Sequence, residues 1–201
     1  ARYYDQRFVP ALEAFNFILH KYPLSNTITE ARIWREKANI RMEFHEVAIK
    51  NLKEILEQED LKEDDRAHAS AMMAQAYIDL AIQDSAVAYI STAAELTDDK
   101  DLKGRYLFIK GQLYDQLGKK DSANLAFDEV IDLHRKTSRI YYVNAHIAKL
   151  HNMEVRGEDR VAALELLQDL AENRENRPFL DKIYFQMGDY FYGTDSLDLA
   201  V

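Results

Sequence analysis

The chain has 201 residues and a mass of 23.4 kDa, with 26 basic and 35 acidic side chains and a formal net charge of −9 at pH 7. This charge argues against a nucleic-acid partner, because it repels a phosphate backbone. No stretch approaches the ~18 uninterrupted apolar residues of a membrane span, and residues 1–8 lack the apolar core of a signal peptide. Cysteine is absent, which excludes disulfides and thiolate metal sites and leaves both cytoplasm and periplasm open as compartments.

The residue content favours helices over strands. Alanine, leucine, glutamate, lysine and glutamine are abundant, while the chain holds only three prolines and six glycines. A chain of this length forms either one globular domain or a solenoid, in which each unit buries its apolar face against its neighbours. Composition therefore predicts an all-helical protein without choosing between these two architectures.

A repeat is visible in six alanines, each of which opens an amphipathic helix. Their successive spacings are 37, 38, 37, 40 and 37 residues. After each of the first five, a large apolar residue follows four positions later and an apolar or small residue three further on, which is one stripe of a helix. The alanines are Ala11, Ala48, Ala86, Ala123, Ala163 and Ala200, followed by Phe15/Ile18, Leu52/Ile55, Ile90/Ala93, Phe127/Val130 and Leu167/Leu170.

A second helix is predicted upstream of these alanines. Twelve residues before three of them lies a small residue with an aromatic three further on, namely Ala74/Tyr77, Gly111/Tyr114 and Gly188/Phe191. The combined pattern resembles the tetratricopeptide repeat, and its best copies begin at Phe8 and Leu107. In such a hairpin the small residue is expected to meet the alanine of the second helix at a close crossing, while aromatics fill the wider gaps.

The predicted fold is all-α: a tetratricopeptide-like superhelix, a solenoid of antiparallel helix pairs with about eleven helices. We expect one solenoid over residues 1–201, with five to six units, truncated units at both ends, and a longer parent chain. The period exceeds the ~34 residues of the consensus. The unit from Tyr141 to Leu170 has His151 in the small slot, so the register of that unit stays open.

Turn and cap residues are predicted at the unit boundaries. Gly118, Gly157 and Gly193 stand between first and second helices, where a positive φ can end a helix. Pro178 is expected to open the helix that contains Phe185. Thr27 with Glu30 has the capping-box spacing, and Asp84-Ser85 and Asp121-Ser122 are candidate caps.

Motifs for catalysis or metal binding are incomplete. His45-Glu46 begins like an H-E-x-x-H zinc helix, but Ile49 stands at the second histidine position. His146 and His151 are five apart and do not share a helical face as an i, i+4 pair would. The sequence contains neither G-x-S-x-G nor a glycine-rich phosphate loop. We therefore expect no enzyme activity, no metal and no cofactor.

Partner binding is expected on the concave groove, which the first helix of each hairpin lines in solenoids of this type. The lysine-and-asparagine clamp of tetratricopeptide co-chaperones is not reproduced, which disfavours chaperone-tail binding. Four aromatic side chains are either core residues or exposed anchors for a partner: Trp34, Phe44, Tyr141 and Tyr142. The candidate partner-binding residues are Ile33, Lys37, Arg41, His68, Gln75, Asp79, Arg105, Phe108, Gln112 and Asp115.

A closer resemblance covers essentially the whole chain. It is carried by ARYYDQRFVPALEAFNFILHKYPLSN, EARIWREKANIRMEFHEVAIKNL and NRENRPFLDKIYFQMGDYF, which are similar to the SprE/PorW family of large tetratricopeptide lipoproteins. The resemblance implies a role in type IX protein secretion and gliding motility, as a lipid-anchored outer-membrane protein facing the periplasm. It also implies partners among the secretion ring or motor subunits, and a lipid-carrying cysteine upstream of this segment.

Other classes remain open from the residues alone. A cytoplasmic tetratricopeptide adaptor that binds peptides would have the same repeat pattern and would lack a secretion signal. A periplasmic solute-binding lipoprotein would need an irregular domain with a sugar pocket, and the segment shows no Gly- and Asn-rich insertions for one. An enzyme would need polar groups that converge in a pocket.

Overall fold

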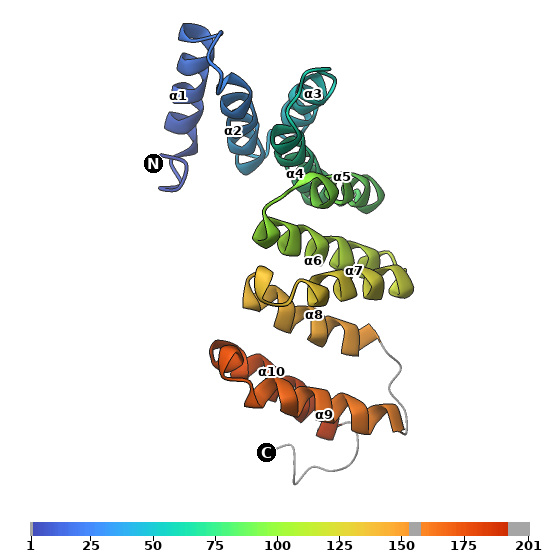
Figure 1. Cartoon of the computed structure of the whole chain (residues 1–201). Coiled ribbons are helices and arrows are strands. Elements are labelled where there is room, and N and C mark those ends of the chain that lie inside the picture. Colours follow the sequence, from blue (N-terminus) through green and yellow to red (C-terminus); the bar gives the residue numbers. More distant parts are fainter. Residues whose placement is uncertain (1, 153–157, 193–201) are drawn as a thin grey trace.

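The computed structural model describes residues 2–152 and 158–192, and every regular element in these two ranges is a helix (Figure 1). Ten of these are α-helices and two are short 3-10 helices, so the prediction of an all-α chain of helix pairs is confirmed. The elements are α1 (Phe8–Lys21), α2 (Ile28–Arg41), α3 (His45–Leu56), α4 (Glu63–Asp79), α5 (Gln83–Leu96), α6 (Lys100–Gln116), α7 (Lys120–Asp132), η1 (His134–Lys136), α8 (Arg139–Asn152), α9 (Glu158–Glu172), η2 (Arg174–Phe179) and α10 (Leu180–Tyr192).

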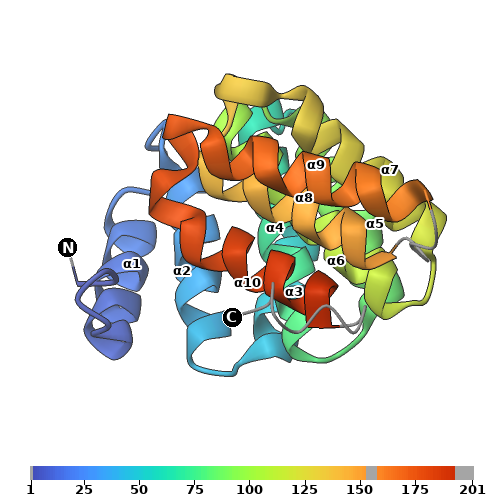
Figure 2. The ribbon, with the colours of Figure 1, turned by 90° about the horizontal axis from the view of Figure 1, so that it is seen from below.

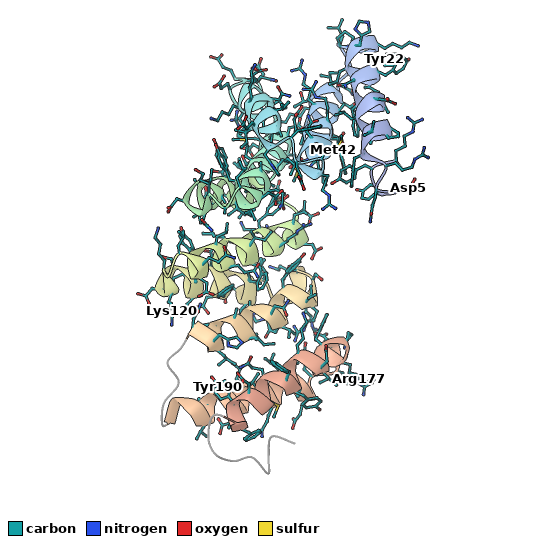
Figure 3. The ribbon with its side chains drawn as sticks, turned by 180° about the vertical axis from the view of Figure 1, so that it is seen from behind. Asp5, Tyr22, Met42, Lys120, Arg177 and Tyr190 are labelled. Atoms are coloured by element: carbon teal, nitrogen blue, oxygen red, sulfur yellow. The ribbon has the colours of Figure 1, made fainter. Side chains whose placement is uncertain are left out.

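The helices form a stack in chain order. Each helix packs on the next from α1 through α8, and α9 packs on α10. In Figure 3, Asp5 and Met42 lie toward one end of the first helix pair and Tyr22 at the other, as expected for antiparallel neighbours. Figure 2 looks along the stack from the α10 end, with α1 at one side. First helices of successive units also touch, because α2 packs on α4 and α6 on α8.

The alanines of the repeat lie on the buried face of the second helices. All five alanines in the described residues are buried, with at most 4% of Ala163 exposed. The large apolar residues four positions later are buried as well in α3, α5, α7 and α9, namely Leu52, Ile90, Phe127 and Leu167. The sixth alanine, Ala200, lies outside the described residues. The predicted stripe therefore forms the core, as its spacing requires.

The small residue of the first helix lies against an aromatic ring of the second helix. A Cβ placed on Gly111 of α6 would lie 2.4 Å from Cε1 of Phe127 on α7. Phe127 itself is only 1% exposed. Glycine at position 111 therefore leaves room for the aromatic ring of the second helix.

The turns that join the first and second helices of three units share one backbone geometry. Gly118 has a φ of 71°, and Ala81 and Glu43 adopt φ values of 57° and 65° at the same place in the two preceding units. In each turn the following N–H donates to a carbonyl five residues back, as in Ile82 to Tyr77 at 2.8 Å. This is a Schellman-type helix end, which favours glycine. Gly157 and Gly193 lie outside the described residues.

Several predicted caps are wrong. Thr27 makes no side-chain capping hydrogen bond, and α5 and α7 begin at Gln83 and Lys120, before the acidic residues expected to cap them. Pro178 lies inside η2 rather than at the start of α10. The side chain that does cap a long helix is Asp99, whose Oδ1 accepts from the N–H groups of Asp101 and Leu102.

Ala81→Gly should stabilise the protein by about 0.5–1 kcal/mol, because an L residue in the left-handed region costs more than the entropy that glycine loses. The same change at Ala88, an exposed position within α5, should destabilise by about 1 kcal/mol. Urea denaturation of the two variants measures both effects. Destabilisation by both substitutions would contradict the strained turn.

Candidate binding groove

A groove of about 700 Å³ opens between the first helices of three consecutive units, α2, α4 and α6. These helices lie on one side of the stack, with α4 between the other two (Figure 1). Buried apolar residues such as Ile40, Ala71 and Ile90 form its floor. We call this the α2–α4–α6 groove; it is lined chiefly by Tyr3, Tyr4, Trp34, Lys37, Arg41, Asp64, His68, Met72, Gln75, Ile78, Asp79, Asp98, Asp99, Leu102, Arg105, Tyr106 and Ile109.

Aromatic rings form the wall beside α2. The rings of Tyr3 and Tyr4 meet Trp34 edge-on, with centroids 5.3 and 5.9 Å away, and Trp34 in turn meets His68 at 5.9 Å. Tyr4 is 73% exposed, so its ring faces solvent. Burial raises the pKa of the Tyr3 hydroxyl, and the charge of Arg41 opposes this shift. The wall therefore presents apolar ring surface to a ligand.

Three cations stand in the same groove. Lys37 Nζ lies 4.2 Å from the Trp34 ring centroid and 5.4 Å from that of Tyr3, and Arg41 sits 5.4 Å from the Phe8 ring. Burial lowers the pKa of Lys37, and the charge of Arg105 lowers it further. The groove thus holds Lys37 in cation–π contacts and in a setting that disfavours its own charge.

Acidic side chains in the groove already have other roles. Asp79 accepts a hydrogen bond from Gln75 at 2.8 Å and lies 3.3 Å from Nε2 of His45. Asp99 caps α6, and Asp64 lies in the first turn of α4, where the helix dipole favours a carboxylate. Asp98 is exposed in the loop before α6. The groove therefore carries both signs of charge, with four aspartates and three cations among its lining residues.

Two buried histidines should make the protein sensitive to acid. Burial lowers the pKa of His68 to about 4, helped by the charge of Lys37. Burial also lowers the pKa of His146 to about 4, and the Nε2 of His146 is enclosed without a hydrogen-bond partner among the described residues. An unfolded histidine titrates near 6.5, so between about pH 6.5 and 4 the unfolded chain binds more protons than the folded one.

The free energy of unfolding should therefore fall by about 2 kcal/mol per histidine between pH 7 and 5, and stability returns as the pH rises. Urea denaturation at the two pH values measures this loss. His68→Gln and His146→Gln should each flatten the pH dependence, whereas His20→Gln, at an exposed position, should leave it unchanged. An identical pH dependence in all four proteins would contradict the assignment.

The structure brings six of the ten expected partner-binding residues together in the groove: Lys37, Arg41, His68, Gln75, Asp79 and Arg105. The other four lie elsewhere. Ile33 is 0% exposed in the core between α2, α3 and α4, so it offers no surface to a partner. Phe108 is half-buried against Phe127 and Tyr141, with centroids 5.7 and 6.0 Å away. Gln112 and Asp115 are exposed on α6 outside the groove lining.

Sequence reasoning missed the aromatic wall and part of the groove lining. Trp34 precedes Lys37 by three residues and Ile109 follows Arg105 by four. Including the residues three and four positions from each expected residue, which share its helical face, would have found both. Tyr3 and Tyr4 lie before the first helix, and only tertiary packing places them here. Of the four aromatics with an open role, Trp34 lines the groove, Tyr141 packs on Phe108, Tyr142 lies 3.9 Å beneath the Arg139 guanidinium, and Phe44 is half exposed.

Within the described residues no group of three or more His, Asp or Glu side chains is placed to hold a metal ion. The described helices also include none that is long and apolar enough to cross a membrane. The chemistry that the groove offers is recognition through rings, cations and hydrogen-bonding groups.

Neither a protein-family model nor a curated protein matches the chain. Solved structures do resemble it. A tetratricopeptide repeat protein from Parabacteroides merdae ATCC 43184 is 14% identical with a TM-score of 0.68, over 99% of this chain and 72% of that one. BtubC (BKLC) from P. vanneervenii is 15% identical with a TM-score of 0.66, over 97% and 84%, and MamA is 16% identical with a TM-score of 0.59, over 100% and 91%. At these identities the likeness shows the fold, a tetratricopeptide-like solenoid.

Proposed function

We propose that this chain is a non-catalytic scaffold that holds a segment of another protein in the α2–α4–α6 groove. The observation that carries the proposal is the groove itself, which spans three units and combines exposed aromatic surface with charged side chains over about 700 Å³. This size lies within the range of sites that enclose a ligand. Extended concave surfaces of solenoids are suited to this role, because the stacked units supply many contacts without a conformational change.

We further propose the setting in which the scaffold works. The three stretches similar to the SprE/PorW family support a role in type IX protein secretion and gliding motility. In that setting the full-length protein would be lipid-anchored at the outer membrane, facing the periplasm, and its partners would be secretion ring or motor subunits. This finer role rests on the sequence resemblance alone, and a cytoplasmic adaptor is the alternative.

Pull-down from gently solubilised membranes tests both proposals. Wild-type protein should recover secretion subunits, and the double variant Arg41→Glu/Arg105→Glu should recover much less of them. Both positions are exposed, so the double variant should keep its melting temperature. Lys120→Glu is the control for a charge reversal outside the groove, because Lys120 is an exposed cation at the start of α7.

The pull-down distinguishes the groove, the secretion role and net charge as the cause of binding. Equal recovery by the wild type and the double variant would remove the groove as the binding surface. Groove-dependent recovery of cytosolic proteins with no secretion subunit would leave the scaffold role and contradict the secretion role. Loss of recovery in the Lys120→Glu control as well would show that net charge, and not the groove, governs binding.

A further inference from the structure

The loop between α1 and α2 carries an apolar tip at one extreme of the molecule, where Figure 3 shows Tyr22. Leu24 is 97% exposed, Phe17 57% and Tyr22 52%. The Nζ of Lys21 lies 5.2 Å from the Phe17 ring centroid and 5.6 Å from the Tyr22 ring centroid, so one cation joins the two rings. We call Phe17, Lys21, Tyr22 and Leu24 the α1–α2 tip.

The backbone that carries these side chains is an ordered turn. The N–H of Tyr22 donates to the carbonyl of Ile18 at 2.9 Å, that of Ser25 to the carbonyl of Tyr22 at 3.1 Å, and that of Ile28 to the carbonyl of Ser25 at 3.1 Å. The tip therefore protrudes from a fixed loop, and a contact made through it costs little ordering of the chain.

The exposure of Phe17 does not arise because α1 stands at the end of the stack. Phe17 follows the repeat alanine of α1 by six positions. In α3, α5, α7 and α9 the same position holds a polar residue that is not buried, namely Glu54, Thr92, Glu129 and Asp169. This position is therefore open to solvent in each described second helix, and α1 alone fills it with an aromatic ring.

The segment around the tip also differs from its counterparts in charge. Residues 14–29 contain no acidic side chain, whereas the segments at the same place in the other four units contain three to seven each, namely residues 51–66, 89–104, 126–141 and 166–181. With His20 neutral, Lys21 gives residues 14–29 a net charge of +1 in a chain of −9. The tip thus lacks the carboxylates that a phosphate-bearing surface would repel.

We infer that the α1–α2 tip is a contact for the surface of a phospholipid membrane. Its three apolar side chains would reach the boundary between head groups and acyl chains, with Lys21 at the level of the phosphates. Tyrosine rings and lysines with long apolar stems favour this boundary, and the ammonium is complementary in charge to the phosphate that every phospholipid carries. A protruding tip suits a soft surface, whereas a protein partner would need a pocket shaped to three side chains around a cation.

The inference goes beyond the scaffold function and does not depend on it, because the tip shares no residue with the lining of the α2–α4–α6 groove. Three side chains give a weak, reversible contact, so binding is measured with an excess of lipid. The expected effect is largest where the apolar side chains themselves are removed.

Fluorescence of a single nitrobenzoxadiazole label tests the contact, because the chain has no cysteine of its own. Leu24→Cys carries the label at the tip, and Leu125→Cys, at a 66% exposed leucine of α7, carries the control label. Phosphatidylcholine vesicles should shift the emission of the label at position 24 to the blue and raise its intensity, and should leave the label at position 125 unchanged. No change at position 24, or the same change at both positions, would overturn the inference.

Co-sedimentation of unlabelled protein with the same vesicles gives an independent measure. Phe17→Ser/Leu24→Ser should lower the partition coefficient at least about tenfold, because it removes most of the apolar surface of the tip. The matched control is Leu125→Ser/Val161→Ser, which replaces two exposed apolar residues of α7 and α9 and should bind as the wild type does.

Equal partitioning of the two double variants would overturn the inference. Quenching of the position-24 label by a protein of a lipid-free cell extract, without a response to vesicles, would also overturn it and make the tip a protein contact.

Discussion

Replacing Phe127 with alanine is expected to lower the free energy of unfolding by about 3–5 kcal/mol. Phe127 is 1% exposed and is the largest fully buried side chain in the described residues. The Phe127 ring lies beside Gly111 and contacts the ring of Phe108, and both of these residues belong to α6. Removing the Phe127 ring therefore opens a cavity between α6 and α7. Chemical denaturation in urea gives the change directly.

The control lies two residues away on the same helix. Leu125 is 66% exposed, so Leu125→Ala should change stability by no more than about 0.5 kcal/mol. A Phe127→Ala variant that is as stable as Leu125→Ala would show that the assigned face of α7 is wrong. The comparison thus tests the repeat register in the unit that contains α6 and α7.

Glu36→Leu is expected to destabilise by about 3 kcal/mol, because it removes a buried carboxylate whose partners stay behind. Glu36 is 0% exposed, and it accepts hydrogen bonds from Arg35 Nε at 2.6 Å, Asn39 Nδ2 at 2.8 Å and Asn51 Nδ2 at 3.1 Å. Asn51 belongs to α3, so the carboxylate joins α2 to α3. Thermal and urea denaturation measure the loss.

Two further variants separate the network from ordinary burial. Glu36→Gln keeps one acceptor oxygen and should lose less stability than Glu36→Leu. Glu46→Leu, at an exposed position in the first turn of α3, should have little effect. If Glu36→Leu proved as stable as the wild type, apolar packing would replace the network without cost, and the hydrogen bonds would not stabilise the helix pair.

The fold was predictable because its determinants are local and repeated. An alanine followed by apolar or small residues at helical spacing recurs every 37 to 40 residues, and the sets on α3, α5, α7 and α9 lie in the buried clusters. The turns were less predictable. Ala81 and Glu43 adopt the left-handed conformation without being glycine, because two backbone hydrogen bonds hold each turn regardless of the side chain.

The groove was predictable only where the helical face alone decides exposure. Lys37 and Arg105 point away from the second helices of their units, so the repeat register was enough to place them. Ile33 stands four residues before Lys37 on the same helix, but it is buried in a cluster with residues of α3 and α4. Phe108 is covered by Tyr141 of α8 in the same way. Contacts between units are set by tertiary packing, which a single helical period does not encode.

The central claim, that the groove holds a partner protein, is tested most directly by site-specific photo-crosslinking. The sequence has no cysteine, so Asp98→Cys at the groove rim carries a single benzophenone label. Asp121→Cys, at an exposed position of α7 outside the groove, carries the matched control label. We predict that the label at position 98 captures a defined protein from source-cell extracts, that Arg41→Glu/Arg105→Glu abolishes this capture, and that the label at position 121 does not capture it. Equal capture from both positions, or capture that survives the double charge reversal, would contradict the account.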